Sequence, residues 1–113
     1  ACYGLRLEHV RRCEVTGHEI GQATRAAVAI DHGTEVTVAE SLIEDSPVGI
    51  RLGRSLPYGR PPADCRLLRN ALVSNGCAIR MESGRRTLIE DNLDQGNQVF
   101  LECSEECLGT EVR

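Results

Sequence analysis

The sequence lacks lysine and tryptophan and has only three aromatic residues among its 113 positions, Tyr3, Tyr58 and Phe100. Aromatic side chains bury the largest area per residue, so the core must be built from valine, isoleucine, leucine and alanine and is lean for this length. The sequence also lacks the apolar run of roughly 18 to 20 residues that a membrane-spanning helix requires. We therefore expect one domain over residues 1–113, with no membrane span.

Acidic residues outnumber arginines everywhere except in one segment. The chain carries 13 arginines against 17 acidic residues, a net charge of −4. Residues 51–69 carry a net charge of +4, whereas residues 1–50 and 70–113 each carry −4. Duplex binding depends on the neutralisation of many phosphates, so an acidic chain with one basic segment is not expected to bind nucleic acid.

The six cysteines contain no C-x-x-C pair, which argues against a zinc ribbon and a thioredoxin-like site. Their even number predicts three disulfides of about 2 to 4 kcal/mol each, which would offset the lean core. This interpretation places the protein in a secreted or extracytoplasmic (lumenal) compartment. The preferred pairing joins Cys2 to Cys13, with Cys65 and Cys77 tied to each other or to Cys103 and Cys107. Reduced or metal-bound cysteines in a cytosolic domain are the alternative.

The hydrophobic pattern predicts a mainly β fold, a small antiparallel β-sandwich or barrel stapled by disulfides. Alternation over residues 2–8 indicates a half-buried strand. Asp31-His32-Gly33 predicts a hairpin between residues 26–30 and 34–39. Residues 77–103 predict a three-strand antiparallel meander, with Ser83-Gly84 as its first turn.

Residues 65–74 are predicted to form one short helix. Asp64 is a suitable cap, and Leu67, Leu68, Ala71 and Leu72 share one helical face. A strand is the alternative, because Leu67, Ala71 and Val73 also fit a period of two. No internal repeat is evident in the sequence.

The best candidate for an interaction site is the segment 51–62, which holds three of the four prolines. Its partner-binding residues are predicted to be Arg51, Arg54, Tyr58 and Arg60, because arginine and tyrosine are enriched at binding hot spots. The competing interpretation is a solvated loop whose arginines pair with the acidic remainder of the chain.

No catalytic residue, metal site or cofactor is predicted. Asp31 and His32 are adjacent but fall in a predicted turn, and no G-x-S-x-G sequence is present. Cys103 and Cys107 are four residues apart, yet two soft ligands do not complete a tetrahedral set.

The arrangement of Asn75-Gly76-Cys77, residues 99–103 and Cys107 resembles the cysteine spacing in the second half of zona pellucida-type polymerisation modules. The resemblance is confined to residues 65–107 and implies an immunoglobulin-like β-sandwich in extracellular filaments. The aromatic-rich strand usual in that family is missing here, and the final cysteine spacing is shorter.

Together these observations favour a disulfide-stabilised, secreted or lumenal domain that recognises a protein or glycan partner or serves as a subunit of an extracellular assembly. No motif specifies a reaction. A small enzyme, or an enzyme subunit that uses histidine and carboxylate groups, is the alternative from another class, and it would need a pocket where these groups converge.

Overall fold

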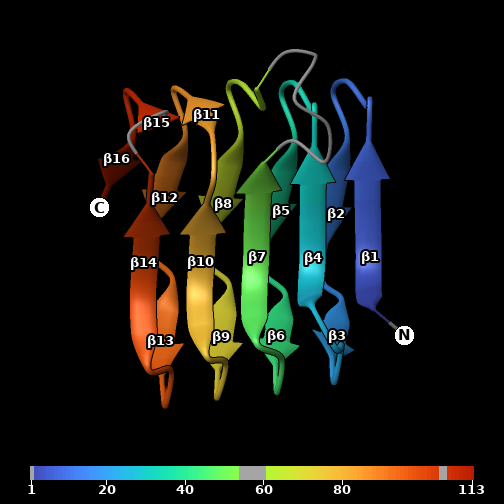
Figure 1. The fold of residues 1–113 in the computed structure, drawn as a ribbon, viewed down its shortest axis with the longest axis vertical. Coiled ribbons are helices and arrows are strands. Elements are labelled where there is room, and N and C mark those ends of the chain that lie inside the picture. The colour runs from blue at the N-terminus through green and yellow to red at the C-terminus, as the bar shows by residue number, and fades with distance from the viewer. Residues whose placement is uncertain (1, 54–60, 105–106) are drawn as a thin grey trace.

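The chain winds into a β-solenoid of about four turns. The computed structural model describes residues 2–53, 61–104 and 107–113. The turns stack along the solenoid axis, and each turn contributes strands to three sheets that run along that axis (Figure 1). No helix among the described residues is long and apolar enough to cross a membrane.

The front sheet contains the longest strands, in the order β1 (Tyr3–Glu8), β4 (Ala26–Asp31), β7 (Val48–Gly53), β10 (Cys77–Met81) and β14 (Val99–Cys103). Behind it lie two sheets of short strands (Figure 1). The upper back sheet contains β2 (Glu14–Thr16), β5 (Thr37–Ala39), β8 (Arg66–Leu68), β12 (Leu88–Glu90) and β16 (Glu111–Val112). The lower back sheet contains β3 (Glu19–Gly21), β6 (Leu42–Glu44), β9 (Ala71–Val73) and β13 (Leu93–Gln95). A two-stranded corner sheet joins β11 (Gly84–Arg85) to β15 (Cys107–Leu108).

The register of the front sheet reveals an internal repeat, so the expectation that the sequence has none is wrong. Leu5 lies beside Val28, Val28 beside Ile50, Ile50 beside Ile79 and Ile79 beside Leu101. The successive differences are 23, 22, 29 and 22 residues. The third step is seven residues longer than its neighbours. Asp31 pairs with Gly53 and Thr34 pairs with Ala63, so the extra residues lie between Gly53 and Ala63. This insertion hides the period from a simple comparison of segments.

The predicted antiparallel sandwich or barrel is wrong, because every strand pair in the described part of the chain is parallel. The meander over residues 77–103 does not form: β10 pairs with β7 and β14, one turn away on either side. The predicted turns at 31–33 and 83–84 are corners of the solenoid, where the chain leaves one sheet for the next. The immunoglobulin-like sandwich implied by the zona pellucida resemblance is excluded for the same reason.

The predicted helix over residues 65–74 is also wrong. These residues form β8 and β9 with a corner between them. Leu67 and Leu72 are both fully buried, one from each strand. A spacing of five residues puts both side chains inside because the chain bends at the corner, and local periodicity does not include that bend.

The core consists of columns of aliphatic side chains. Fully buried residues of the front sheet stack on one another, namely Val28, Ile30, Ile50, Leu52, Ile79 and Met81. Each turn encloses a narrow interior that valine, isoleucine and leucine can fill by stacking on the turns above and below. The scarcity of aromatic residues therefore suits the fold and needs no compensation by disulfides.

The six cysteines are all free, so the prediction of a fold stapled by disulfides is wrong. The register explains why. Thiols stacked on adjacent turns would be separated by 22, 23 or 29 residues, and no two cysteines in the sequence have such a separation. Cys13 and Cys65 occupy one column but have Val36 between them, which separates their strands by about 10 Å, more than a disulfide spans.

Asparagine amides form hydrogen bonds across two corners of every turn in the second half of the solenoid; those of Asn70 and Asn75 are buried, and those of Asn92 and Asn97 are half-buried. Asn70 Nδ2 donates to the carbonyl of Val38 at 3.0 Å, and its Oδ1 accepts from the backbone nitrogen of Ser41 at 3.1 Å. Asn75 makes the same pair of bonds with Ile43 and Ser46 at 3.1 and 3.2 Å. Asn92 and Asn97 continue the two ladders in the next turn. All four asparagines of the chain serve these ladders.

Candidate functional site

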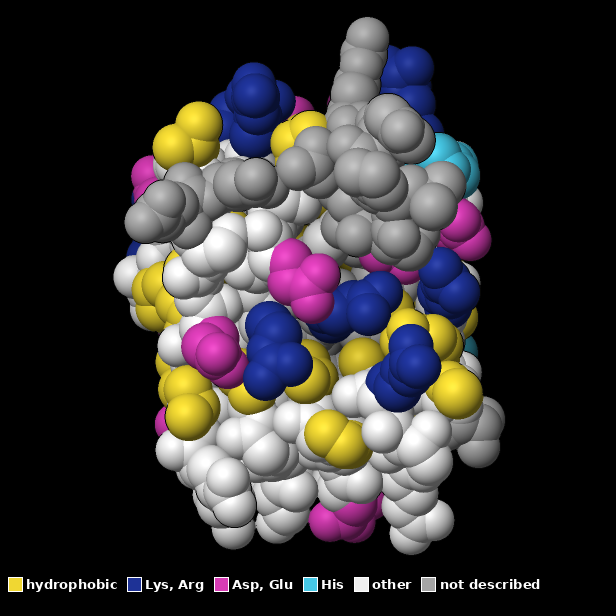
Figure 2. Space-filling view, viewed as in Figure 1, with side chains coloured by type: hydrophobic (Ala, Val, Ile, Leu, Met, Phe, Trp, Pro, Cys, Tyr) yellow, Lys and Arg dark blue, Asp and Glu magenta, His cyan; other side chains and the backbone are white. Residues whose placement is uncertain are grey.

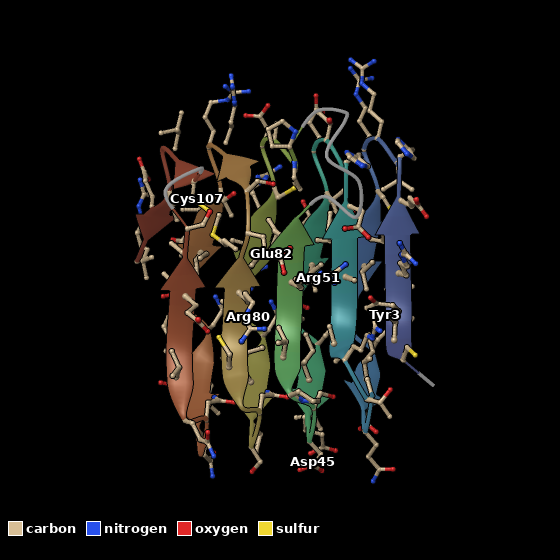
Figure 3. All side chains as sticks on the ribbon, in the orientation of Figure 1. Tyr3, Asp45, Arg51, Arg80, Glu82 and Cys107 are labelled. Atoms are coloured by element: carbon tan, nitrogen blue, oxygen red, sulfur yellow. The ribbon has the colours of Figure 1, made fainter. Side chains whose placement is uncertain are left out.

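Three sulfur atoms gather where the front sheet passes into the corner sheet. The register places Met81, at the end of β10, beside Cys103, at the end of β14. Cys103 Sγ lies 4.0 Å from Met81 Sδ. Cys107 Sγ lies 3.3 Å from the Met81 carbonyl oxygen. In Figure 3, Cys107 lies beyond the ends of β10 and β14. We call Met81, Cys103 and Cys107 the sulfur cluster.

The Cys107 thiol affects the titration of its neighbour Cys103. Burial raises the pKa of Cys103, and the neighbouring Cys107 thiol raises it further by disfavouring a second negative charge. Cys65 differs, because it is fully buried in the core and that burial raises its pKa to about 11. Cys103 is exposed and Cys107 is half-buried, so both thiols of the cluster can be reached from solvent.

A surface hollow of about 230 Å³ leads to the sulfur cluster. Met81, Cys103 and Ser104 line it together with Arg80, Glu82 and Glu102. Arg80 pairs with Glu102 at 3.3 Å, whereas Glu82 has no arginine partner among the ion pairs of the described residues. An acidic group at the mouth of a hollow attracts cations.

A second candidate site is a row of charged side chains on the outer side of the front sheet. The register aligns Arg6, Ala29, Arg51, Arg80 and Glu102 across five strands. Figure 2 shows arginine side chains as a band across this face, with apolar side chains around and below them. We call this row the arginine row.

Asp31 holds the arginine row in place. Its carboxylate is fully buried and accepts from Arg51 Nη2 at 3.2 and 3.3 Å and from Arg6 Nε at 3.2 Å. Arg51 Nη1 also donates to the Tyr3 hydroxyl at 3.3 Å, and its guanidinium carbon lies 5.4 Å from the centre of the Tyr3 ring. Slight burial acts to raise the pKa of Tyr3, but hydrogen bonds and positive charge from Arg25 and Arg51 outweigh it and lower that pKa.

Of the four residues predicted to bind a partner, one lies within the described residues and three lie outside them. Arg51 belongs to the arginine row, where it is 17% exposed. Arg54, Tyr58 and Arg60 lie outside the described residues. The partners of Arg51, namely Tyr3 and Asp31, come from other turns of the solenoid, and sequence reasoning did not connect them.

The three histidines lie at two different corners of the solenoid, His9 and His32 at one and His18 at another. His9 and His32 stack with ring centres 4.6 Å apart at successive turns, and the backbone nitrogen of His18 donates to Ser41 Oγ at another corner. Within the described part of the chain, no group of three or more histidine, cysteine, aspartate and glutamate side chains could hold a metal ion. The sulfur cluster is a different donor set, because its third member is a methionine.

A scan of protein families matched residues 1–107 to the model described as "Periplasmic copper-binding protein (NosD)". The chain belongs to the NosD family. This assignment confirms the predicted extracytoplasmic location. Searches of curated proteins and of solved structures gave no match.

The NosD family name implies copper, and the donor set of the sulfur cluster fits one oxidation state of that metal. Thiolate and thioether ligands are soft and select Cu(I). In a copper-loaded protein, Met81, Cys103 and Cys107 would hold the ion. Sequence reasoning missed this site because it paired Cys103 with Cys107 alone. The overlooked signal was the only methionine of the chain, which lies 22 residues before Cys103, one turn of the solenoid.

Proposed function

We propose that this extracytoplasmic NosD-family domain binds a protein partner across the outer side of the front sheet. The observation that carries the proposal is the arrangement of Arg51, fixed by the buried carboxylate of Asp31 and packed on Tyr3. Arginine and tyrosine dominate binding hot spots. A side chain already held in place loses less conformational entropy when a partner binds.

The shape of the molecule favours a macromolecular partner for this face. Small ligands require a concave pocket that buries most of their surface. The broad side seen in Figure 1 extends 32 by 31 Å. That area is on the order of 1,000 Å², whereas a standard interface covers about 800 Å² on each partner. The guanidinium groups of Arg6, Arg51 and Arg80 suit a partner surface that presents carboxylates.

Photo-crosslinking tests this function. A photoreactive residue at Glu102, on the arginine row, should give a discrete protein adduct in the cells that make the protein, whereas one at Asp94, on the lower back sheet, should give none. Adducts that form equally at both positions would contradict the proposal. A product removed by glycosidases, together with binding to acidic glycans on an array, would assign a glycan in place of a protein.

Variants connect the adduct to the arginine row. Arg51→Gln alone leaves the buried Asp31 with Arg6 as its remaining arginine partner, which endangers folding. The Asp31→Asn, Arg51→Gln double variant keeps that position neutral and should abolish the Glu102 adduct. The matched control is Arg66→Gln, an exposed arginine on the upper back sheet, which should leave the adduct unchanged.

A further inference from the structure

We propose that the sulfur atoms of Met81, Cys103 and Cys107 bind one cuprous ion. The family name indicates copper but assigns no residue, and the site is defined by the contacts of the sulfur cluster. Arg80 and Glu102 belong to the arginine row and also line the hollow, but none of the three sulfur donors lies in that row. The inference can therefore be tested separately from the proposed partner-binding face.

The separation of the sulfur atoms fits a three-coordinate ion. With metal–sulfur bonds of about 2.3 Å, a trigonal-planar site separates its sulfur atoms by about 4.0 Å. Cys103 Sγ and Met81 Sδ are 4.0 Å apart. Cys107 Sγ lies 3.3 Å from the backbone carbonyl oxygen of Met81, and its thiol interacts with that of Cys103, so the third donor lies beside the other two.

The chemistry of the donors favours Cu(I) over Zn(II). Structural zinc sites use four ligands drawn from cysteine, histidine and carboxylate groups. A thioether with two thiols supplies three soft donors, which Cu(I) accepts. Binding displaces the two thiol protons to solvent and forms three metal–sulfur bonds. No electron is transferred, so the site needs no oxidant or reductant to fill.

The fold places the three donors before any metal arrives. Backbone pairing between β10 and β14 sets Met81 beside Cys103, and pairing between Gly84 and Cys107 in the corner sheet fixes the third donor. Met81 is only 1% exposed, so its thioether is held inside, whereas Cys103 faces the hollow that Glu82 and Glu102 also line. The ion therefore has an entry path from solvent.

The test is a Cu(I) competition titration against a chromophoric Cu(I) chelator, performed without oxygen on the full chain. Wild type should bind one tightly held equivalent, with sulfur-only ligation in X-ray absorption. Cys103→Ser and Cys107→Ser should each weaken binding by at least about tenfold. Met81→Leu conserves volume and keeps both thiols, so a weakening in that variant identifies the thioether as a ligand.

Matched controls separate this site from general thiol binding. Cys2→Ser removes an exposed cysteine at the far end of β1 and should leave Cu(I) affinity unchanged. Circular dichroism of each variant checks that the solenoid persists. Equal affinity in wild type, Cys103→Ser and Met81→Leu would overturn the proposal. So would a preference for Zn(II) over Cu(I), or a Cys103–Cys107 disulfide in protein exported from the cytoplasm that takes up no Cu(I).

Discussion

The corners of the solenoid fall into two kinds. The corner between the upper and lower back sheets always has two residues between strands, and the corner from the lower back sheet to the front sheet has three or four. We call these the amide corners. The front corner, between the front sheet and the upper back sheet, ranges from five residues after β1 to twelve after β7. Each amide corner varies by one residue at most, whereas the front corner varies by seven.

The difference follows from how each corner satisfies its backbone. At the amide corners, side chains turned inward accept from backbone nitrogens of the preceding turn, in two columns. The side chains of Ser41, Asn70 and Asn92 accept from the backbone of His18, Ser41 and Asn70, and those of Ser46, Asn75 and Asn97 accept from the backbone of Ala23, Ser46 and Asn75. An extra residue there would break the register of several buried hydrogen bonds. At the front corner, charged side chains pair on the outside, for example Asp64 with Arg86 at 2.7 Å. Insertions, and the Cys107 thiol, are therefore tolerated at the front corner.

The largest expected effect is at an amide corner. Asn70→Ala leaves the buried backbone nitrogen of Ser41 and the carbonyl of Val38 without their partner. We expect a loss of about 3 kcal/mol in the free energy of unfolding, measured by denaturant titration. Asn70→Ser, which copies the residue at Ser41 one turn earlier, should cost less. A loss in Asn70→Ala no greater than that of an exposed substitution would remove the distinction between the corners.

A change at the front corner should have a far smaller effect on the free energy of unfolding. The preceding turn connects Asp31 to Thr34 with only His32 and Gly33. Replacing residues 54–62 with a His-Gly pair restores the 22-residue period, and it should raise the free energy of unfolding by less than about 1 kcal/mol because the connection is shorter. Denaturant titration gives the comparison with Asn70→Ala. Loss of cooperative unfolding would show that the insertion is structural. Loss of the Glu102 crosslink would assign partner contacts to Arg54, Tyr58 or Arg60.

The smallest effect concerns the exposed ion pair of the front corner. A hydrogen bond and the positive charge from Arg86 lower the pKa of Asp64 against a small opposing effect of burial. The stability that this pair contributes is present above the ordinary carboxyl pKa of 3.8 and is lost as pH falls through the lowered value. NMR titration should show the Asp64 pKa rising in Arg86→Gln, while the melting temperature at neutral pH stays unchanged. An unchanged Asp64 pKa would show that the pair does not persist in solution.

Part of the repeat could have been predicted from the sequence. Ser41 and Ser46, Asn70 and Asn75, and Asn92 and Asn97 are hydroxyl or amide pairs with a constant spacing of five residues. A comparison that allowed for one insertion would have found them. The strand at residues 2–8 was anticipated because alternation is local. The helix over 65–74 was wrongly predicted because Leu67 and Leu72 face one interior only after the bend at the corner.

The candidate sites were less accessible to prediction. Arg51 was identified from its residue type, but Asp31 and Tyr3, which orient it, lie 20 and 48 residues away in sequence. The disulfide prediction failed because it assumed that every cysteine pairs with another cysteine. The stacking of turns instead brought Cys103 to the sulfur of Met81.

The sequence alone determined the strand-rich composition and the aliphatic core, because these follow from residue types and local alternation. The extracytoplasmic location rests on the family match, since the disulfides from which it was first inferred do not form. The tertiary structure decided which residues meet. In a parallel solenoid, contacts are set by the length of each turn and not by proximity along the chain. One seven-residue insertion was enough to conceal that length, and with it the neighbours of Arg51 and Cys103.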